Sequence, residues 1–184
     1  MNVIQTKIKD LVIIEPKVFG DDRGFFYETF QSARYKDAGI NENFVQDNRS
    51  RSTQGVLRGL HFQKTKPQGK LVTVTQGEVF DVAVDLRPNS ETFGQHEAVI
   101  LTGKNKLQFY VPPGFAHGFC VLSDTADFQY KCTDYYDPSD EGGLLWNDID
   151  LKIKWPLTRP LLSDKDAIQP TLASIKEKLI NGWV

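Results

Sequence analysis

The chain has 184 residues, of which 40% are hydrophobic and 25% are charged, and its formal net charge is −2. This size and composition predict one globular domain over residues 1–184 with its own core. The small net charge excludes a general attraction to nucleic acid or to an anionic membrane surface. The N-terminus has no apolar signal core, and no segment approaches the roughly 18 apolar residues that span a bilayer, so we expect a cytoplasmic protein.

Short runs of Val, Ile, Phe, Tyr and Thr, separated by Gly, Pro, Asn and Asp, dominate the chain from Val12 to Cys132. Such runs predict an all-β barrel or sandwich. In chain order, the expected strands are 12–19, 44–50, 56–63, 70–76, 78–87, 97–102, 107–111, 117–122 and 126–133. Helices are expected only at the margins, over 31–38 and after Pro170, where Thr171 can cap an amphipathic segment. Exposed sheet edges favour pairing with a second copy, so we expect a homodimer.

The clearest predicted strand runs from Glu78 to Arg87, because apolar side chains alternate along it with mostly charged ones. The apolar set is Phe80, Val82, Val84 and Leu86, and the other set is Asp81, Ala83, Asp85 and Arg87. A solvated sheet surface would explain the charged set, and so would a barrel whose interior is a polar ligand cavity. The alternation alone leaves both interpretations open.

One histidine motif raises the question of a metal. The run from Pro112 through Gly114 to His117 resembles the second motif of cupin barrels, in which this histidine is often a metal ligand. The other ligands in those proteins come from a His-x-His pair and a glutamate, whereas this chain offers only the stretch His61–Gln63. Because a catalytic site usually needs about three protein ligands, we expect no metal.

The two cysteines, Cys120 and Cys132, have neither the close spacing of a metal knuckle nor that of a redox dithiol motif. Both lie in strand-like stretches. We therefore expect free, buried thiols.

Without a metal, side chains can still abstract a proton beside a carbonyl if the developing oxyanion is stabilised. His61 is a candidate base, Lys70 a candidate cation facing the enolate, and Tyr130 a candidate acid on the opposite face. Asp166 is a candidate for orienting His61 and stabilising its charge. Together these residues would form an acid–base site for enolisation.

Three basic residues, Arg23, Arg58 and Lys165, suit the oxygens of a diphosphate, because guanidinium offers a bidentate fork and lysine a point charge. Arg58 and His61 are three residues apart, so a regular strand would aim them at opposite faces. A bulge at Gly59 would bring both side chains to one face.

Seven longer motifs between about Ile13 and Asp166 are more specific than any single residue. They are Phe19–Phe26, Val45–Asn48, Val56–Gln63, Gly69–Val72, Gly77–Asp85, Gly114–Phe119 and Leu145–Asp148. Together they resemble the dTDP-4-dehydrorhamnose 3,5-epimerase family. The resemblance implies a cupin jelly-roll barrel with a few short peripheral helices, dimeric through exchange of N-terminal strands. It also implies conversion of dTDP-4-keto-6-deoxyglucose to the L-rhamno 4-ketone without a cofactor, before a reductase yields dTDP-L-rhamnose.

The resemblance assigns roles by motif position. His61 looks like the base with Asp166 as its partner, Tyr130 like the acid, and Lys70 like the residue facing the C4 oxygen. The nucleotide site, reached by the partner subunit, would contain Arg23, Phe26 and Glu28. The rest of the substrate pocket would contain Gln46, Asn48, Arg58, Lys70, His117, Glu141 and Lys165, with Tyr136 stacking or bonding nearby. Two departures concern substrate breadth: Arg49 stands where many relatives have histidine, and the 64–68 loop is short.

Three other functions remain as alternatives. A related enzyme could invert only C3 or only C5, or isomerise the keto group, in the pathway of another dTDP-deoxysugar. A sugar-nucleotide-binding cupin without activity would use the arginines but not the set of His61, Lys70, Tyr130 and Asp166. A metal-dependent cupin oxygenase would need the ligands that the sequence lacks.

Overall fold

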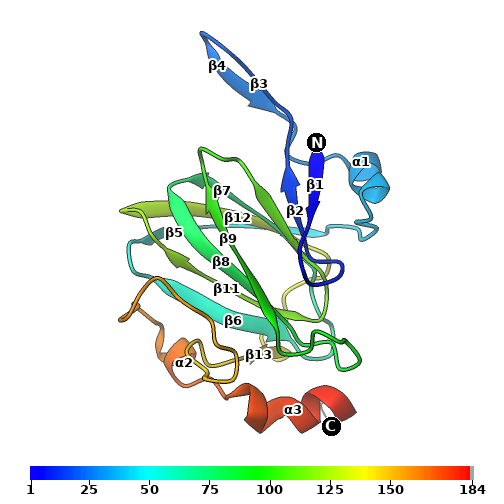
Figure 1. Cartoon of the computed structure of the whole chain (residues 1–184), viewed down its shortest axis with the longest axis vertical. Helices are drawn as coiled ribbons and strands as arrows, with labels where there is room; N and C mark the ends of the chain where they lie inside the picture. The colour runs from blue at the N-terminus through cyan, green and yellow to red at the C-terminus, as the bar shows by residue number, and fades with distance from the viewer. Residues whose placement is uncertain (183–184) are drawn as a thin grey trace.

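The computed structural model describes residues 1–182 and consists mainly of two β-sheets facing each other, with three short helices (Figure 1). The six-stranded sheet has the order β1 (Asn2–Gln5), β2 (Val12–Glu15), β10 (Gln108–Val111), β7 (Lys70–Gln76), β12 (Thr125–Cys132) and β5 (Gln46–Thr53). The five-stranded sheet has the order β13 (Glu141–Gly143), β6 (Leu57–Gln63), β11 (Phe115–Val121), β8 (Glu78–Asp85) and β9 (His96–Thr102). Neighbouring strands are antiparallel. The predicted all-β architecture is confirmed.

The main apolar core lies between the two sheets. Val72 and Phe109 contribute to it from the six-stranded sheet, and Leu101 from the other. Phe128 of β12 stacks on Phe119 of β11 with ring centroids 3.9 Å apart, which joins the two sheets through one aromatic pair. Burial of such side chains is the main favourable term in forming the barrel.

Strand β8 is buried on both of its faces. Val82 and Val84 pack with Leu172 of the C-terminal helix on the outside of the sheet, whereas Ala83 belongs to the core between the sheets. Asp81, which alternates with these apolar residues, has no exposed surface. The interpretation of the charged set as a solvated surface is therefore wrong for Asp81, and that of a partly polar barrel interior is right.

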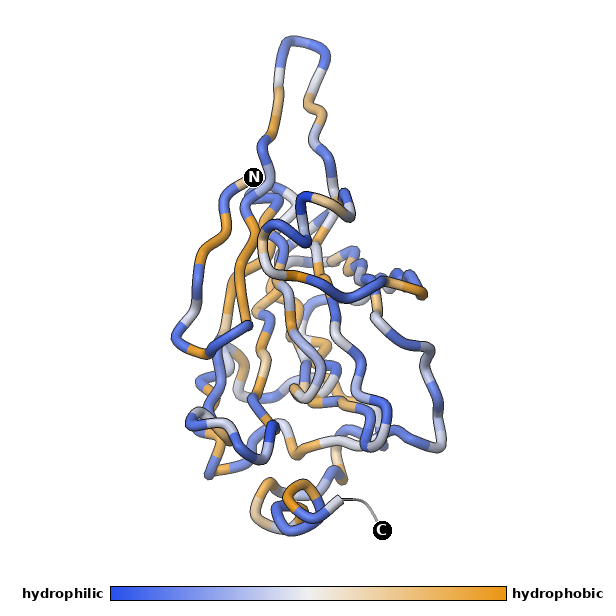
Figure 2. The backbone as a smooth tube through the Cα atoms, turned by 90° about the vertical axis from the view of Figure 1, so that its right-hand side faces the viewer, coloured by the Kyte–Doolittle hydropathy of each residue, from blue (hydrophilic) through white to orange (hydrophobic). Residues whose placement is uncertain are grey.

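A long hairpin projects from the barrel, and it begins within the single strand that the sequence predicted over 12–19. The chain breaks at Pro16 and then forms β3 (Val18–Asp21) and β4 (Gly24–Tyr27), which pair only with each other. Figures 1 and 2 show this hairpin extending beyond the sheets. Phe25 is 63% and Phe26 70% exposed, so the hairpin carries aromatic side chains that this chain does not cover.

The other differences from the predicted strands are local. The short strands β1 and β13 were not predicted, β5 continues to Thr53, and β8 ends at Asp85 rather than at Arg87. The chain turns after Asp85 because Arg87 folds back and donates from its backbone N–H and its guanidinium to the Asp85 carboxylate. The alternation of apolar and charged residues does not predict a turn that a single ion pair stabilises.

The three helices lie outside the sheets, as the sequence predicted for two of them. α1 (Ser32–Asp37) begins after Gln31, and α3 (Leu172–Asn181) begins after Thr171, whose side chain accepts from the N–H of Ser174. α2 (Asp164–Ala167) has only four residues, too few for a periodic signal. Among residues 1–182, no helix is long and apolar enough to cross a membrane.

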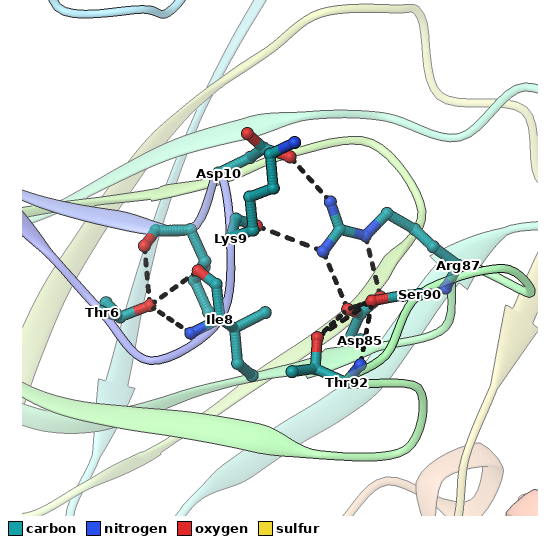
Figure 3. A network of polar contacts seen from close by, with 9 residues as sticks. Thr6, Ile8, Lys9, Asp10, Asp85, Arg87, Ser90 and Thr92 are labelled. Atoms are coloured by element: carbon teal, nitrogen blue, oxygen red, sulfur yellow. Dashed lines mark hydrogen bonds and ion pairs between the residues drawn. The ribbon is translucent and has the colours of Figure 1, made fainter.

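A polar network fastens the N-terminal turn to the end of β8 (Figure 3). The guanidinium of Arg87 donates to Asp85, to Asp10 and to the carbonyl of Lys9. Thr92 also donates to Asp85. Segments far apart in the sequence are thus joined through the guanidinium of Arg87, which the buried Asp85 carboxylate holds in place.

Both cysteines, Cys120 and Cys132, are buried and free, as the sequence predicted. Burial raises the pKa of the Cys120 thiol to about 12. Cys120 is therefore an inert thiol.

Candidate active site

A cavity of about 790 Å³ opens between the two sheets. From the five-stranded sheet and α2, its predicted lining residues are Arg58, His61, His117, Glu141, Lys165 and Asp166. From the six-stranded sheet and the loop after β12, they are Gln46, Asn48, Lys70, Tyr130 and Tyr136. The structure thus brings together all the predicted catalytic residues and most of the predicted substrate-binding ones.

His61 and Asp166 form a pair at the cavity wall. The Nε2 atom of His61 lies 2.5 Å from Oδ1 of Asp166, and the Asp166 side chain is only 4% exposed against 26% for His61. Because a carboxylate can only accept, a neutral His61 in this pair carries its proton on Nε2. That leaves Nδ1 as the basic nitrogen of the ring.

The surroundings of Asp166 keep it ionised. Burial alone would raise the pKa of this carboxyl, but His61, the Ser163 hydroxyl and the backbone N–H of Gly59 outweigh burial and hold the pKa below its ordinary value. Ser163 is the N-cap of α2 and accepts from the N–H of Asp166. The capped first turn of α2 therefore fixes the backbone of Asp166 beside His61.

A bulge in β6 places Arg58 and His61 on the same cavity, as the sequence analysis required. His61 pairs with His117 and Arg58 with Phe119, so three steps along β6 oppose two along β11. Gly59 has a φ of +124°, and a Cβ there would lie 2.6 Å from the Cα of Gly118. Only glycine fits this close approach of the two strands.

Tyr130 and Lys70 stand on the opposite wall from His61, because they belong to the six-stranded sheet. The ammonium of Lys70 is 5.9 Å from the centroid of the Tyr130 ring. Burial raises the pKa of the Tyr130 phenol, which keeps it protonated, and lowers the pKa of the Lys70 ammonium. Among the described residues, no carboxylate lies within ion-pair distance of Lys70.

Arg58 is also free of a carboxylate partner in the part of the chain that the structure describes. Its Nε donates to the hydroxyl of Ser52, 3.1 Å away. Ser52 belongs to β5, in the sheet opposite Arg58, and Gln46 and Asn48 lie on the same strand. The Gln46 amide donates to Asn48 over 3.1 Å. The cavity is thus lined by one guanidinium without a carboxylate partner and by two amides, of which that of Gln46 also accepts from the N–H of Tyr136.

The rim of the cavity is a cluster of three predicted residues. Lys165 donates to both carboxylate oxygens of Glu141 at 2.8 Å, and the hydroxyl of Tyr136 donates to Glu141 at 3.0 Å. Burial would raise the pKa of the Glu141 carboxyl, but Lys165 and Tyr136 hold it below its ordinary value. The cluster joins β13 to α2 across the cavity edge.

His117 pairs with Asp81, a residue that sequence reasoning had not assigned to the site. His117 Nε2 lies 2.9 Å from Oδ1 of Asp81. The alternating pattern of β8 did signal that Asp81 belongs to a polar face, but the pattern does not say which residue on another strand it meets.

Three predicted residues lie away from the cavity of their own chain. Arg23 and Phe26 are on the projecting hairpin, and Glu28 follows it. The Arg23 side chain is 90% exposed and pairs with Asp21 of the same hairpin, while Glu28 pairs with Arg34 at 2.9 Å. Within this chain, none of the three lines the cavity.

Within residues 1–182, no group of three or more His, Cys, Asp and Glu side chains is arranged to hold a metal ion. The position that follows His61 by two residues is Gln63, whose amide bonds the backbone carbonyl of Lys66. Gln63 is therefore committed to fixing the 64–68 loop.

Comparisons with known proteins agree on one family. The family model described as dTDP-4-dehydrorhamnose 3,5-epimerase matches residues 5–174. A relative of that name from Escherichia coli K12 is 57% identical over 98% of this chain and 100% of its own length. The crystal structure of the Legionella pneumophila epimerase RmlC in complex with dTDP-4-keto-L-rhamnose is 58% identical, with a TM-score of 0.94 over 97% of this chain and 96% of that one.

A third relative shows how far the fold extends. The structure of ChmJ, a 3'-monoepimerase from Streptomyces bikiniensis in complex with dTDP-quinovose, is 32% identical. Its TM-score is 0.89, and the match covers 96% of this chain and 91% of that one. The fold therefore serves one-centre and two-centre epimerases alike, whereas the family model and the higher identities single out the latter. The chain belongs to the dTDP-4-dehydrorhamnose 3,5-epimerase family.

Proposed function

We propose that the chain is a dTDP-4-dehydrorhamnose 3,5-epimerase, an isomerase that inverts C5 and C3 of dTDP-4-dehydro-6-deoxy-D-glucose. The observation that carries the mechanism is the placement of His61 and Tyr130 on opposite sheets across one cavity. Inversion needs a base on one face of the sugar and an acid on the other. Family membership supports the substrate, and this geometry supports the chemistry.

His61 acts as the base. The C4 ketone acidifies the hydrogens on both neighbouring carbons, and the Nδ1 lone pair of His61 takes one of them. Asp166, held ionised as described above, stabilises the imidazolium that forms. The C–H electron pair forms a carbon–carbon double bond to C4, and the negative charge of the resulting enolate lies on the C4 oxygen.

Lys70 and Tyr130 complete the step from the other wall. The ammonium of Lys70 faces the enolate oxygen, where a cation in a water-poor cavity stabilises the developing charge. Tyr130, kept protonated by burial, delivers a proton to the carbon from the side opposite His61. His61 then returns its proton to solvent and Tyr130 regains one, and repetition at the second carbon flanking the ketone inverts the second centre.

Polar residues remote from the reacting carbons hold the nucleotide. Arg58 has the unpaired guanidinium suited to a diphosphate, and the rim cluster of Tyr136, Glu141 and Lys165 borders the sugar end. Anchoring the diphosphate lets remote binding energy orient the sugar for both proton transfers. In this scheme side chains make both proton transfers, so the reaction uses no cofactor.

We also propose a homodimer in which the hairpin reaches the partner's cavity. The exposed Phe26 ring offers a stacking surface for a base, and Arg23 and Glu28 offer polar contacts. Mixing an Arg23→Ala chain with a His61→Ala chain tests this directly. A mixed dimer has one site with both native residues, so activity should rise above that of either variant alone; no gain would place the hairpin outside the site.

Proton NMR of the substrate with the protein in heavy water tests the reaction. Loss of both the C3 and the C5 signals, with turnover when a rhamnose-forming reductase is added, is the expected result. Loss of one signal would make the protein a single-centre epimerase. Loss of neither would leave a sugar-nucleotide-binding protein. The cytoplasmic location expected from the sequence remains a prediction.

A further inference from the structure

Asp81 is a buried carboxylate behind the cavity wall, and the mechanism above gives it no role. It lies on β8 diagonally across from His117 on β11, and His117 in turn pairs in register with His61 on β6. Asp81 is fully buried and His117 is 6% exposed. Three neighbouring strands therefore carry the proposed base, a second imidazole and a carboxylate in one row.

The cost of burying Asp81 is not offset by its own hydrogen bonds. Its Oδ1 atom bonds His117, but its Oδ2 atom has no hydrogen-bond partner in the part of the chain that the structure describes. The neighbours on the same face of β8, Val79 and Ala83, belong to the apolar core. An ionised carboxylate in such surroundings destabilises the fold unless it is fully bonded, so packing does not explain this residue.

We infer that Asp81 is a positioning residue for the proposed epimerisation, which fixes the orientation of the His117 ring at the cavity wall. This inference rests on the proposed function. The bond to Asp81 occupies Nε2 of His117, and the ring also stacks on Phe128 at 6.1 Å between centroids. Nδ1 is then the ring nitrogen that His117 offers to a sugar in the cavity.

Asp81 also bears on the protonation of Lys70. Burial lowers the pKa of the Lys70 ammonium, and the carboxylates of Asp81 and Glu141 are among the groups that oppose this effect. The Tyr130 ring is the remaining neighbour described for the ammonium. Removing the charge of Asp81 should therefore lower the pKa of Lys70 further, so Lys70 would lose its proton at a lower pH.

The test compares Asp81→Asn with Asp85→Asn. Both replace a fully buried aspartate on β8 by its neutral isostere, but Asp85 lies outside the cavity and bonds Arg87. For Asp81→Asn we expect kcat to fall roughly 10-fold to 100-fold, because a misplacement of about 1 Å in an active site costs on the order of 10²-fold. Binding of dTDP should change less than about twofold, because this change leaves the polar residues of the nucleotide site in place. The alkaline limb of the pH–kcat profile should move to lower pH.

The matched control should keep the wild-type kcat and pH profile. An Asp81→Asn protein that only melts at a lower temperature, with both kinetic properties unchanged, would overturn the inference. A wild-type protein that exchanges neither substrate proton would instead overturn the proposed function. The two failures are therefore distinguishable.

A second measurement does not depend on the folding of Asp81→Asn. Long-range ¹H–¹⁵N NMR of the wild-type protein reports the tautomer of each imidazole, and spectra of His61→Asn and His96→Gln leave the His117 signals assigned. The expected result is a proton on Nε2 of His117. A neutral ring with its proton on Nδ1 alone would contradict the pairing with Asp81.

Discussion

Strand β8 buries two carboxylates four residues apart, and their surroundings differ sharply. Asp85 accepts from the backbone and guanidinium of Arg87 and from the hydroxyls of Ser90 and Thr92 (Figure 3). Asp81 accepts from one imidazole, and one of its oxygens has no partner among the described atoms. The fully bonded Asp85 holds Arg87, which bonds the N-terminal turn, whereas the incompletely bonded Asp81 lies behind the cavity wall.

The difference teaches where to look for function in this barrel. A buried carboxylate surrounded by donors stabilises the fold, because each donor offsets its desolvation. A buried carboxylate that serves a single imidazole acts through that imidazole. Changes near the cavity should therefore alter rates more than stability, and changes near Asp85 should do the reverse.

After loss of the base His61 itself, the largest effect on rate is expected at Asp166. Asp166→Asn should lower kcat roughly 10³-fold or more, because the amide can donate to Nε2 of His61 and move the ring proton to Nδ1, the basic position. A coupled assay with a rhamnose-forming reductase measures kcat, and calorimetry with dTDP serves as the binding control. A variant within about threefold of the wild-type kcat would remove Asp166 from the mechanism.

Tyr130→Phe should separate the two proton transfers. Deprotonation by His61 persists, so the substrate still takes up deuterium, while product formation falls on the order of 10²-fold because the far-side acid is missing. NMR gives the ratio of deuterium uptake to product. Equal losses of uptake and product would show instead that Tyr130 acts in the deprotonation step.

Asp85→Asn should lower stability without changing the rate. We expect the free energy of unfolding to fall by roughly 2–3 kcal/mol, because the Arg87 guanidinium loses its anionic partner, while kcat stays unchanged. Chemical denaturation and the coupled assay measure the two quantities. A large fall in kcat with an unchanged unfolding free energy would reverse the assignment.

The loss of stability in the same variant should depend on pH. Burial would raise the pKa of Asp85, but Arg87, Ser90 and Thr92 hold it below its ordinary value of 3.8. A lowered pKa in the folded state gives stability that is fully present above 3.8 and is lost as pH falls through the folded value. The difference in unfolding free energy between wild type and Asp85→Asn should thus be constant above pH 3.8. It should shrink as the pH falls below this value.

The smallest effect is expected at Ser163. Its hydroxyl caps α2 and contacts Asp166, and such a cap contributes about 1 kcal/mol. Ser163→Ala should therefore lower kcat by at most about tenfold, by loosening Asp166, with little change in dTDP binding. An unchanged kcat would mean that His61 alone holds Asp166 in place.

Much of this arrangement could be predicted from the sequence, for identifiable reasons. The alternation along β8 and the cap at Thr171 predicted real elements because each depends on residues close in sequence. The predicted bulge at Gly59 was confirmed because two residues three apart had to share a face. The cavity residues came from motif resemblance, and the cavity contains the four assigned to the chemistry.

The rest depends on contacts between distant segments. The bond between Asp81 and His117 follows from the register of β8 and β11, which no local pattern specifies. α2 has four residues and β13 three, so neither presents a periodic signal. The strand predicted over 12–19 is interrupted after Glu15, and β4 was not predicted, because the hairpin lies outside the sheets and leaves its aromatic side chains exposed.

The central claim is that His61 removes the protons that the epimerisation exchanges. The most direct test incubates the substrate with His61→Ala and with wild type in heavy water and follows deuterium at C3 and C5. The account predicts uptake at both carbons with wild type and almost none with His61→Ala, although the variant still binds dTDP. Full uptake by a folded His61→Ala protein would contradict it and place the base elsewhere in the cavity.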